Sequence, residues 1–294
     1  MRYLVSVSGL FLRKEPRKEK GNERAVLPEG CEVEVLEKSG SWSRVSGSLD
    51  GVPFEGWVAS RYLEPRANIK FDTASKLVPV HWRENNPKSI RSGPASASPL
   101  GETGMPRPRV RSAAGLDQII EWLGVEQSRR YRPGGGLTYC NIYAYDVAYA
   151  AGVYLPRVWW TAKALVALEA GQMVAAQYDV TIREMNANAI HDWLQDYGPR
   201  FGWKRVFSLT DLQECANRGG IATICARRKD VSRSGHIVII APETNAVKAR
   251  RDAKGRVTMP VQSQAGSVNF ARGTPRTPWW ADAKFSSFVL FVNG

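Results

Sequence analysis

The sequence predicts two domains of different fold class, a small all-β barrel followed by an α+β domain with an antiparallel sheet. Three observations support this prediction. Residues 1–66 contain short alternating strands separated by turns, and residues 67–112 are rich in Pro, Ser, Asn, Gly and Arg. Residues 113–294 contain amphipathic helices first and β-branched, apolar strands afterwards. With 294 residues and 43% apolar content, the chain has room for about two domains of ~150 residues each.

The strands expected in residues 1–66 show the period-two alternation of a small barrel. They are Tyr3–Val7, Leu10–Leu12, Cys31–Leu36, Trp42–Val45 and Gly56–Val58. The N-terminal stretch runs into charged residues without a small-residue cleavage site, so we expect a strand there and not a signal peptide. The protein is therefore expected to be made in the cytoplasm. Action in the periplasm or cell wall would then need a dedicated route, such as phage lysis or a secretion system.

Residues 67–112 are expected to form a linker, or a segment that wraps over one domain, because they have few aliphatic residues and little periodicity. The expected helices of the α+β domain are Leu116–Leu123, Cys140–Ala151, Thr161–Ala170, Ile190–Asp196 and Leu209–Arg218. The expected strands are Ile221–Ala226, His236–Ala241, Arg256–Gln262 and Ser287–Val292.

The formal net charge of +13 predicts a positive surface that attracts anionic partners. Arg and Lys cluster at 13–24, 107–111 and 128–132, but these clusters form no defined nucleic-acid motif, so we expect no specific nucleic-acid partner. Anionic lipid and the acidic polymers of a bacterial envelope are the other partners that such a charge attracts, and charge alone does not choose between them. No stretch approaches the ~20 apolar residues of a membrane-spanning helix, so no membrane span is expected.

Cys140 is the cysteine expected to carry chemistry. It stands at the predicted start of a helix, with Thr138 as the expected N-cap and Gly134–Gly136 as an open backbone before it. A helix N-terminus favours the thiolate, which is the nucleophilic form of cysteine. The other cysteines, Cys31, Cys215 and Cys225, stand in apolar or turn contexts and are expected to be structural. No CxxC spacing is present, so neither a structural zinc nor a disulfide framework is expected.

His236 is the expected general base, because it opens the apolar strand Ile237–Ile240 and follows Ser234 and Gly235. His191 and His81 are weaker candidates: a helix start explains the first, and the second lies in the expected linker. If the strand of His236 pairs with the next strand, the residue opposite His236 is Gln262 or, with a register shift of two, Gln264.

Asn269 is a further candidate for the residue that orients the imidazole. Glu243 is a less suitable one, because it lies at the far end of the strand, ~20 Å away at ~3.3 Å per residue. The predicted catalytic set is therefore Cys140, His236 and Gln262, with Gln264 and Asn269 as alternatives for the third position.

Residues 1–66 resemble the bacterial SH3 domain family. The resemblance is carried by Leu10–Arg13 followed by Pro16, by Gly30–Leu36, by Ser41–Val45 and by the closing Gly56–Leu63, which contains Gly-Trp-Val and Tyr-Leu. The segment from Arg13 to Arg24 is longer than the usual turn of the family. The resemblance implies a domain that targets the protein to cell-wall peptides. A barrel that only packs against its neighbour is the alternative.

Residues 113–294 resemble the papain-like cell-wall hydrolases, namely the NlpC-type peptidases and the CHAP amidases. Tyr139-Cys140-Asn141, Gly235-His236-Ile237 and Gln262 stand in the order of their helix-capping Cys, strand-opening Gly-His and third polar residue. The resemblance implies a papain-like fold with the nucleophile on a central helix, and cleavage of an amide bond in the peptidoglycan stem peptide or cross-link. It also implies that neither a metal nor an organic cofactor is needed.

Other roles remain open from the sequence. The protein is either a lysin or a secreted antibacterial effector, and an immunity or delivery protein is a conceivable partner. One alternative function is a cysteine protease or deamidase that acts on proteins, and another is a non-catalytic wall-binding scaffold. The tryptophans Trp159, Trp160, Trp279 and Trp280 are candidates for lining a sugar-peptide groove, although packing in the core is the more common role of tryptophan.

Overall fold

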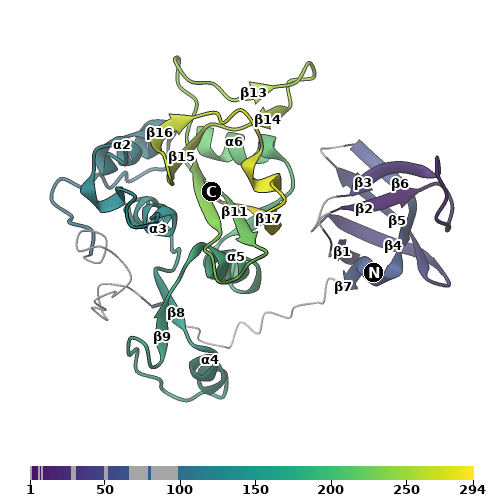
Figure 1. The fold of residues 1–294 in the computed structure, drawn as a ribbon, viewed down its shortest axis with the longest axis horizontal. Coiled ribbons are helices and arrows are strands. Elements are labelled where there is room, and N and C mark those ends of the chain that lie inside the picture. Colours follow the sequence, from purple (N-terminus) through teal and green to yellow (C-terminus); the bar gives the residue numbers. More distant parts are fainter. Residues whose placement is uncertain are drawn as a thin grey trace. The chain divides into compact units, whose positions relative to one another are not determined.

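The computed structural model describes residues 2–5, 7, 9–27, 31–49, 52–65, 79–80 and 99–294 (Figure 1). The chain forms two compact units, Met1–Thr73 and Ala74–Gly294, which are considered separately below. The first is mainly β, and the second is α+β, as the sequence predicts. His81 and most of the expected linker lie outside the described residues.

Among its described residues, the first unit forms a sheet of seven strands in the order β3-β2-β6-β5-β4-β1-β7. The strands are β1 Arg2–Val5, β2 Leu10–Arg13, β3 Glu23–Leu27, β4 Glu32–Ser39, β5 Trp42–Leu49, β6 Val52–Ala59 and β7 Leu63–Pro65, with the 3-10 turn η1 Ser60–Tyr62. Alternating apolar side chains form its core. They are Val5, Leu10, Leu12, Leu27, Cys31, Val33, Val45, Val58 and Leu63.

The segment after Arg13 differs from a plain turn because it ends in β3, a strand that the sequence pattern does not predict. Asn22 holds the segment together: its side-chain nitrogen donates to the carbonyls of Glu15 and Arg17, and its side-chain oxygen accepts from the Glu15 amide. Arg13 forms an ion pair with Glu23 at 2.7 Å. The long insertion is therefore an ordered extension of the barrel.

The second unit is built on an antiparallel sheet of six strands in the order β10-β17-β11-β12-β15-β16 (Figure 1). These strands are β10 Lys204–Val206, β11 Ile221–Arg228, β12 His236–Ile240, β15 Gln262–Ala265, β16 Asn269–Gly273 and β17 Phe285–Asn293. The helices of the unit are α2 Ala113–Leu123, α3 Cys140–Ala150, α4 Ala162–Glu169, α5 Ala187–Asp196 and α6 Leu209–Asn217. Two smaller ribbons are β8 Val158–Trp160 with β9 Ile182–Glu184, and β13 Arg250–Arg251 with β14 Val257–Met259.

The predicted strand Arg256–Gln262 is wrong, because the structure divides it into β14 and β15. Pro260 lies between the two strands, and proline has no N–H to give to a sheet ladder. The two pieces therefore belong to different sheets, and only β15 pairs with β12, with Ile239 opposite Ser263 and Ile240 opposite Gln262.

Helix α3 is buried on all sides, with nine of its eleven residues in the core. It packs on β12 and β15 and is joined to β15 by the Tyr143 hydroxyl, which lies 2.5 Å from the Ser263 hydroxyl. Asp146 on α3 is fully buried and accepts from Arg130 at 2.6 Å and from the Tyr131 hydroxyl at 2.8 Å. A helix held in this way keeps its first residue fixed relative to the sheet.

Part of the expected linker belongs to the core of the second unit. Leu100 and Met105 are buried in it, and Ser112 caps α2 by accepting from the Gly115 amide at 3.1 Å. Val80 is also buried, and its backbone N–H and C=O both bond to the Tyr154 hydroxyl, at 2.9 Å and 3.1 Å. This segment is therefore anchored to the unit at Val80 and again before α2.

Candidate active site

Cys140 is the first residue of α3, but Thr138 is not its N-cap as predicted. The N-cap is Tyr139, and its side chain accepts no hydrogen bond from the backbone N–H groups of the first turn. The first-turn N–H groups of α3 are therefore without the side-chain cap that Ser or Thr supplies elsewhere in this unit. Such groups favour negative charge at the helix start.

The glycines before Cys140 form a tight hairpin. Gly134 and Leu137 exchange two backbone hydrogen bonds, at 3.2 Å and 2.9 Å, and the two residues between them have φ values of 57° and 77°. Two successive left-handed residues are the signature of a type I′ turn, which glycine adopts without a steric penalty. The turn is exposed and ends three residues before Cys140.

His236 begins β12, opposite Ala226 on β11. The glycine before it has a packing role: a Cβ atom on Gly235 would lie 2.2 Å from the Ala226 carbonyl oxygen and 2.7 Å from Asn188 Oδ1. Asn188 also holds the preceding loop, since its side chain donates to the Arg233 carbonyl and accepts from the Arg228 amide. The backbone that carries His236 is thus packed closely against β11 and α5, a constraint that the Ser-Gly-His sequence alone does not reveal.

Cys140 and His236 interact electrostatically, because each side chain shifts the pKa of the other. Burial alone raises the pKa of Cys140, but the charge and hydrogen bond of His236, with the backbone N–H groups of Ile237 and Asn141, lower it below its usual value. Burial likewise lowers the pKa of His236, and the thiolate and Gln264 raise it above its usual value. Both directions favour a thiolate-imidazolium pair.

Gln264 orients the imidazole. Its side-chain nitrogen donates to the Val268 carbonyl at 2.9 Å, so its oxygen faces His236 and lies 2.8 Å from Nε2. His236 therefore donates through Nε2, and Nδ1 is the nitrogen left for Cys140. The side chain of Gln264 extends to the ring from β15, and Gly266 lies beside the ring: a Cβ on Gly266 would be 3.4 Å from His236 Cε1.

Gln262 and Asn269 do not contact His236 directly. The amide oxygen of Gln262 accepts from Trp279 Nε1 at 2.8 Å, and its nitrogen points to Met259 Sδ at 3.2 Å. Asn269 donates to the carbonyls of Val125 and Tyr131. The prediction that Gln262 is the residue opposite His236 is therefore wrong, because Gln262 pairs with Ile240, four residues further along β12.

The four candidate tryptophans have different environments. Trp159, Trp160 and Trp280 are buried, and Trp159 packs against Tyr154, Trp193, Tyr197 and Phe201. These residues are part of the core and do not line an open groove. Trp279 in the 3-10 turn η4 Trp279–Ala281 is half-buried. Its ring contacts the ring of His236, with the ring centroids 4.7 Å apart and an angle of 74° between the ring planes. This contact has no signal in the sequence, because the two residues are far apart along the chain.

The remaining cysteines and His191 have environments that account for them without chemistry. Burial raises the pKa of Cys215, and burial raises that of Cys225 further, so both favour the inert thiol. Cys31 lies in the core of the first unit. His191 is buried, with Nδ1 2.9 Å from Asp192 Oδ1 and Nε2 3.1 Å from Ser287 Oγ. Glu243 pairs with Arg251 and Asn217.

The sulfur of Cys140 is more enclosed than the expectation of an open approach allows. Only 2% of the residue is exposed, whereas His236 is half-buried and Leu137 on the glycine hairpin is 48% exposed. The solvent-facing side of the pair is therefore the imidazole.

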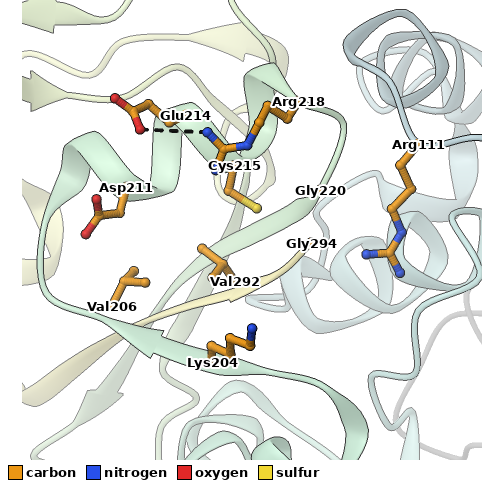
Figure 2. A pocket seen from close by; sticks show the side chains of 10 residues that line it. All are labelled: Arg111, Lys204, Val206, Asp211, Glu214, Cys215, Arg218, Gly220, Val292 and Gly294. Atoms are coloured by element: carbon orange, nitrogen blue, oxygen red, sulfur yellow. Dashed lines mark ion pairs between the residues drawn. The ribbon is translucent and has the colours of Figure 1, made fainter.

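A cavity of about 490 Å³ lies elsewhere in the second unit (Figure 2). Figure 2 shows Arg111, Lys204 and Arg218 around it, with Cys215 among them and Arg218 paired with Glu214 at 3.8 Å. Neither Cys140 nor His236 lines it. Acidic and basic side chains both surround the cavity, so its charge does not define a ligand.

In the described parts of the chain, no group of three or more His, Cys, Asp or Glu side chains is arranged to hold a metal ion. Nor does any helix there have the length and apolar character that a bilayer crossing requires.

Comparison with known proteins identifies the first unit. Residues 8–64 match the family model described as the bacterial SH3 domain. Among solved structures, the chain is similar to NlpC2 from Trichomonas vaginalis, with 11% sequence identity and a TM-score of 0.23, over 94% of this chain and 71% of that one. This likeness is too weak to define the fold of the second unit. No curated protein matches the chain. Residues 8–64 therefore form a bacterial SH3 domain.

Proposed function

We propose that the protein is a cysteine hydrolase that cleaves an amide bond in the stem peptide or cross-link of peptidoglycan. The observation that carries the proposal is the grouping of Cys140, His236 and Gln264: the first two shift each other's pKa towards the ionised pair, and the Gln264 oxygen lies 2.8 Å from His236 Nε2. Nucleophile, base and orienting group are the three parts that acyl transfer by cysteine needs. The bacterial SH3 domain supports a cell-wall substrate, because such domains commonly bind cell-wall peptides.

The proposed reaction begins with attack of the Cys140 thiolate on the amide carbonyl carbon. The oxyanion of the tetrahedral intermediate is stabilised by the first-turn N–H groups of α3, because the Tyr139 side chain accepts no hydrogen bond from them. The His236 imidazolium donates its proton from Nδ1 to the leaving amine, and the C–N bond breaks to give a thioester. His236 then removes a proton from water, which attacks the thioester and releases the acid.

The test is amine release from purified cell walls by the full-length protein. Cys140→Ala is expected to abolish release, and Gln264→Leu is expected to reduce it by ~10–100-fold, because the imidazole loses its orienting hydrogen bond. Cys215→Ala is the matched control, since it removes another buried thiol of the same unit. Undiminished release by Cys140→Ala would refute the mechanism. Mass spectrometry of the released muropeptides identifies the bond.

Two other functions predict different results in the same experiments. A cysteine protease or deamidase that acts on proteins would process casein and leave muropeptides intact, and would also depend on Cys140. A non-catalytic wall-binding scaffold would release no amine, and its Cys140 would be alkylated no faster at neutral pH than an ordinary thiol with a pKa of about 8.5. The lowered pKa of Cys140 favours the two enzymatic functions, the peptidoglycan hydrolase and the protease or deamidase, over the scaffold.

A further inference from the structure

Trp279 connects Gln262 to His236, two residues that do not contact each other directly. Its indole N–H donates to the amide oxygen of Gln262 at 2.8 Å, and its ring contacts the ring of His236 at 4.7 Å with an interplanar angle of 74°. Gln262 thus lies one side chain away from the imidazole. The contact has the edge-to-face geometry that aromatic rings prefer.

The indole has little freedom to move. Its ring also contacts the rings of Trp280 and Phe285. The centroid distances are 5.6 Å and 5.8 Å, and the angles between the ring planes are 87° and 70°. Gln262 has no exposed surface, and its nitrogen lies 3.2 Å from Met259 Sδ. A buried amide that loses its partner incurs a desolvation penalty, so Gln262 keeps its oxygen on the indole N–H.

We propose that Gln262 and Trp279 are positioning residues for His236, with Gln262 fixing the plane of the indole and the indole fixing the plane of the imidazole. A single hydrogen bond from Nε2 to Gln264 leaves the ring free to turn about that bond. The indole removes this freedom, because a turned ring would collide with it or lose its contact. Nδ1 is thereby kept on Cys140. The catalytic meaning of the proposal rests on the proposed function, but the arrangement of thiol and imidazole does not.

The experiment measures the rate of Cys140 alkylation by iodoacetamide between pH 4 and 10, which needs no substrate. Thiolate held by imidazolium reacts at a pH well below the ordinary titration of a thiol. The titratable groups that act on His236 are Cys140 from α3 and Lys284 before β17. Both groups are kept in the variants described next. We expect Trp279→Phe and Gln262→Leu each to lower the rate at pH 6 by about three- to tenfold, the size of one lost hydrogen bond or ring contact.

The double variant tests the order of the contacts. If Gln262 acts only through Trp279, then Gln262→Leu lowers the rate by less than about twofold when Phe already replaces the indole. Trp203→Phe is the matched control, because Trp203 is a buried tryptophan whose N–H also donates at 2.8 Å, to the Tyr154 carbonyl. It is expected to leave the alkylation profile unchanged. Gln262→Met serves as a second, unbranched variant if Gln262→Leu does not fold.

Two outcomes would overturn the proposal. One is a wild-type alkylation profile in folded Trp279→Phe. The other is multiplicative effects of the two substitutions, since Gln262 would then act on His236 by another route. Neither outcome depends on amine release from cell walls. A Cys140→Ala variant that still releases amine would refute the proposed function while leaving these alkylation results valid.

Discussion

Gly235→Ala is the substitution that tests how the backbone places His236. The new Cβ would lie 2.2 Å from the Ala226 carbonyl oxygen, whereas ordinary contact begins at 3.4 Å, so the two strands must separate by ~1 Å. Ala226 is the partner of His236 in the ladder, so this separation moves the imidazole. Overpacking of this kind costs about 1–3 kcal/mol, or a fall in Tm of ~2–12 °C at ~2–4 °C per kcal/mol.

The effect on chemistry should exceed the effect on stability. A displacement of ~1 Å at a reacting group lowers the rate by ~100-fold, so we expect that loss in amine release and a rise in the pH at which Cys140 alkylates. Gly134→Ala is the control, because a Cβ there meets nothing within 4 Å. Adding Asn188→Ala should not rescue the variant, since the nearer obstacle is backbone. A Gly235→Ala protein with wild-type Tm and wild-type alkylation would refute this reasoning.

Two further predictions concern stability. Asp146→Ala leaves Arg130 without its buried carboxylate, which costs about 3–5 kcal/mol, and thermal melting should show Tm lower by ~6–20 °C; an unchanged Tm would contradict this account of the pair. Hydrogen bonding to Arg251, against an opposing effect of burial, lowers the pKa of Glu243 from 4.5 to about 2, so the stability it contributes is fully present above pH 4.5 and is lost as the pH falls towards 2. The Tm difference between the wild type and Glu243→Gln should therefore shrink over that pH range, and a constant difference would contradict it.

The elements that could be predicted from the sequence are those with strong local patterns. The apolar run after His236 and the amphipathic helix before Gly219 appear close to where the structure has them. The strand predicted at Arg256–Gln262 is wrong because Pro260 interrupts it. That error also affected the site, since the register that placed Gln262 opposite His236 assumed one continuous strand.

Contacts between distant segments could not be predicted. Ile237 is expected as a strand residue, yet nothing in the local sequence shows that its backbone N–H helps to lower the pKa of Cys140. The contact of Trp279 with His236 is of the same kind. Gln264 is predicted only through a register shift of two, which differs from the observed pairing of Ile239 with Ser263, yet its side chain lies 2.8 Å from His236 Nε2. The catalytic roles of these residues stay predictions until the variants are assayed.

The bond between Tyr154 and Val80 has a mechanical consequence. Of the described residues of the second unit, Pro79 and Val80 come first in the chain, and both polar groups of the Val80 backbone are held by one hydroxyl. Tension applied to this unit from the N-terminal side of Val80 meets these two hydrogen bonds before it reaches α2. In a Tyr154→Phe protein the two hydrogen bonds are lost, and the load passes further into the fold. The force needed to unfold this unit by pulling on its N-terminal side should therefore be lower in that variant.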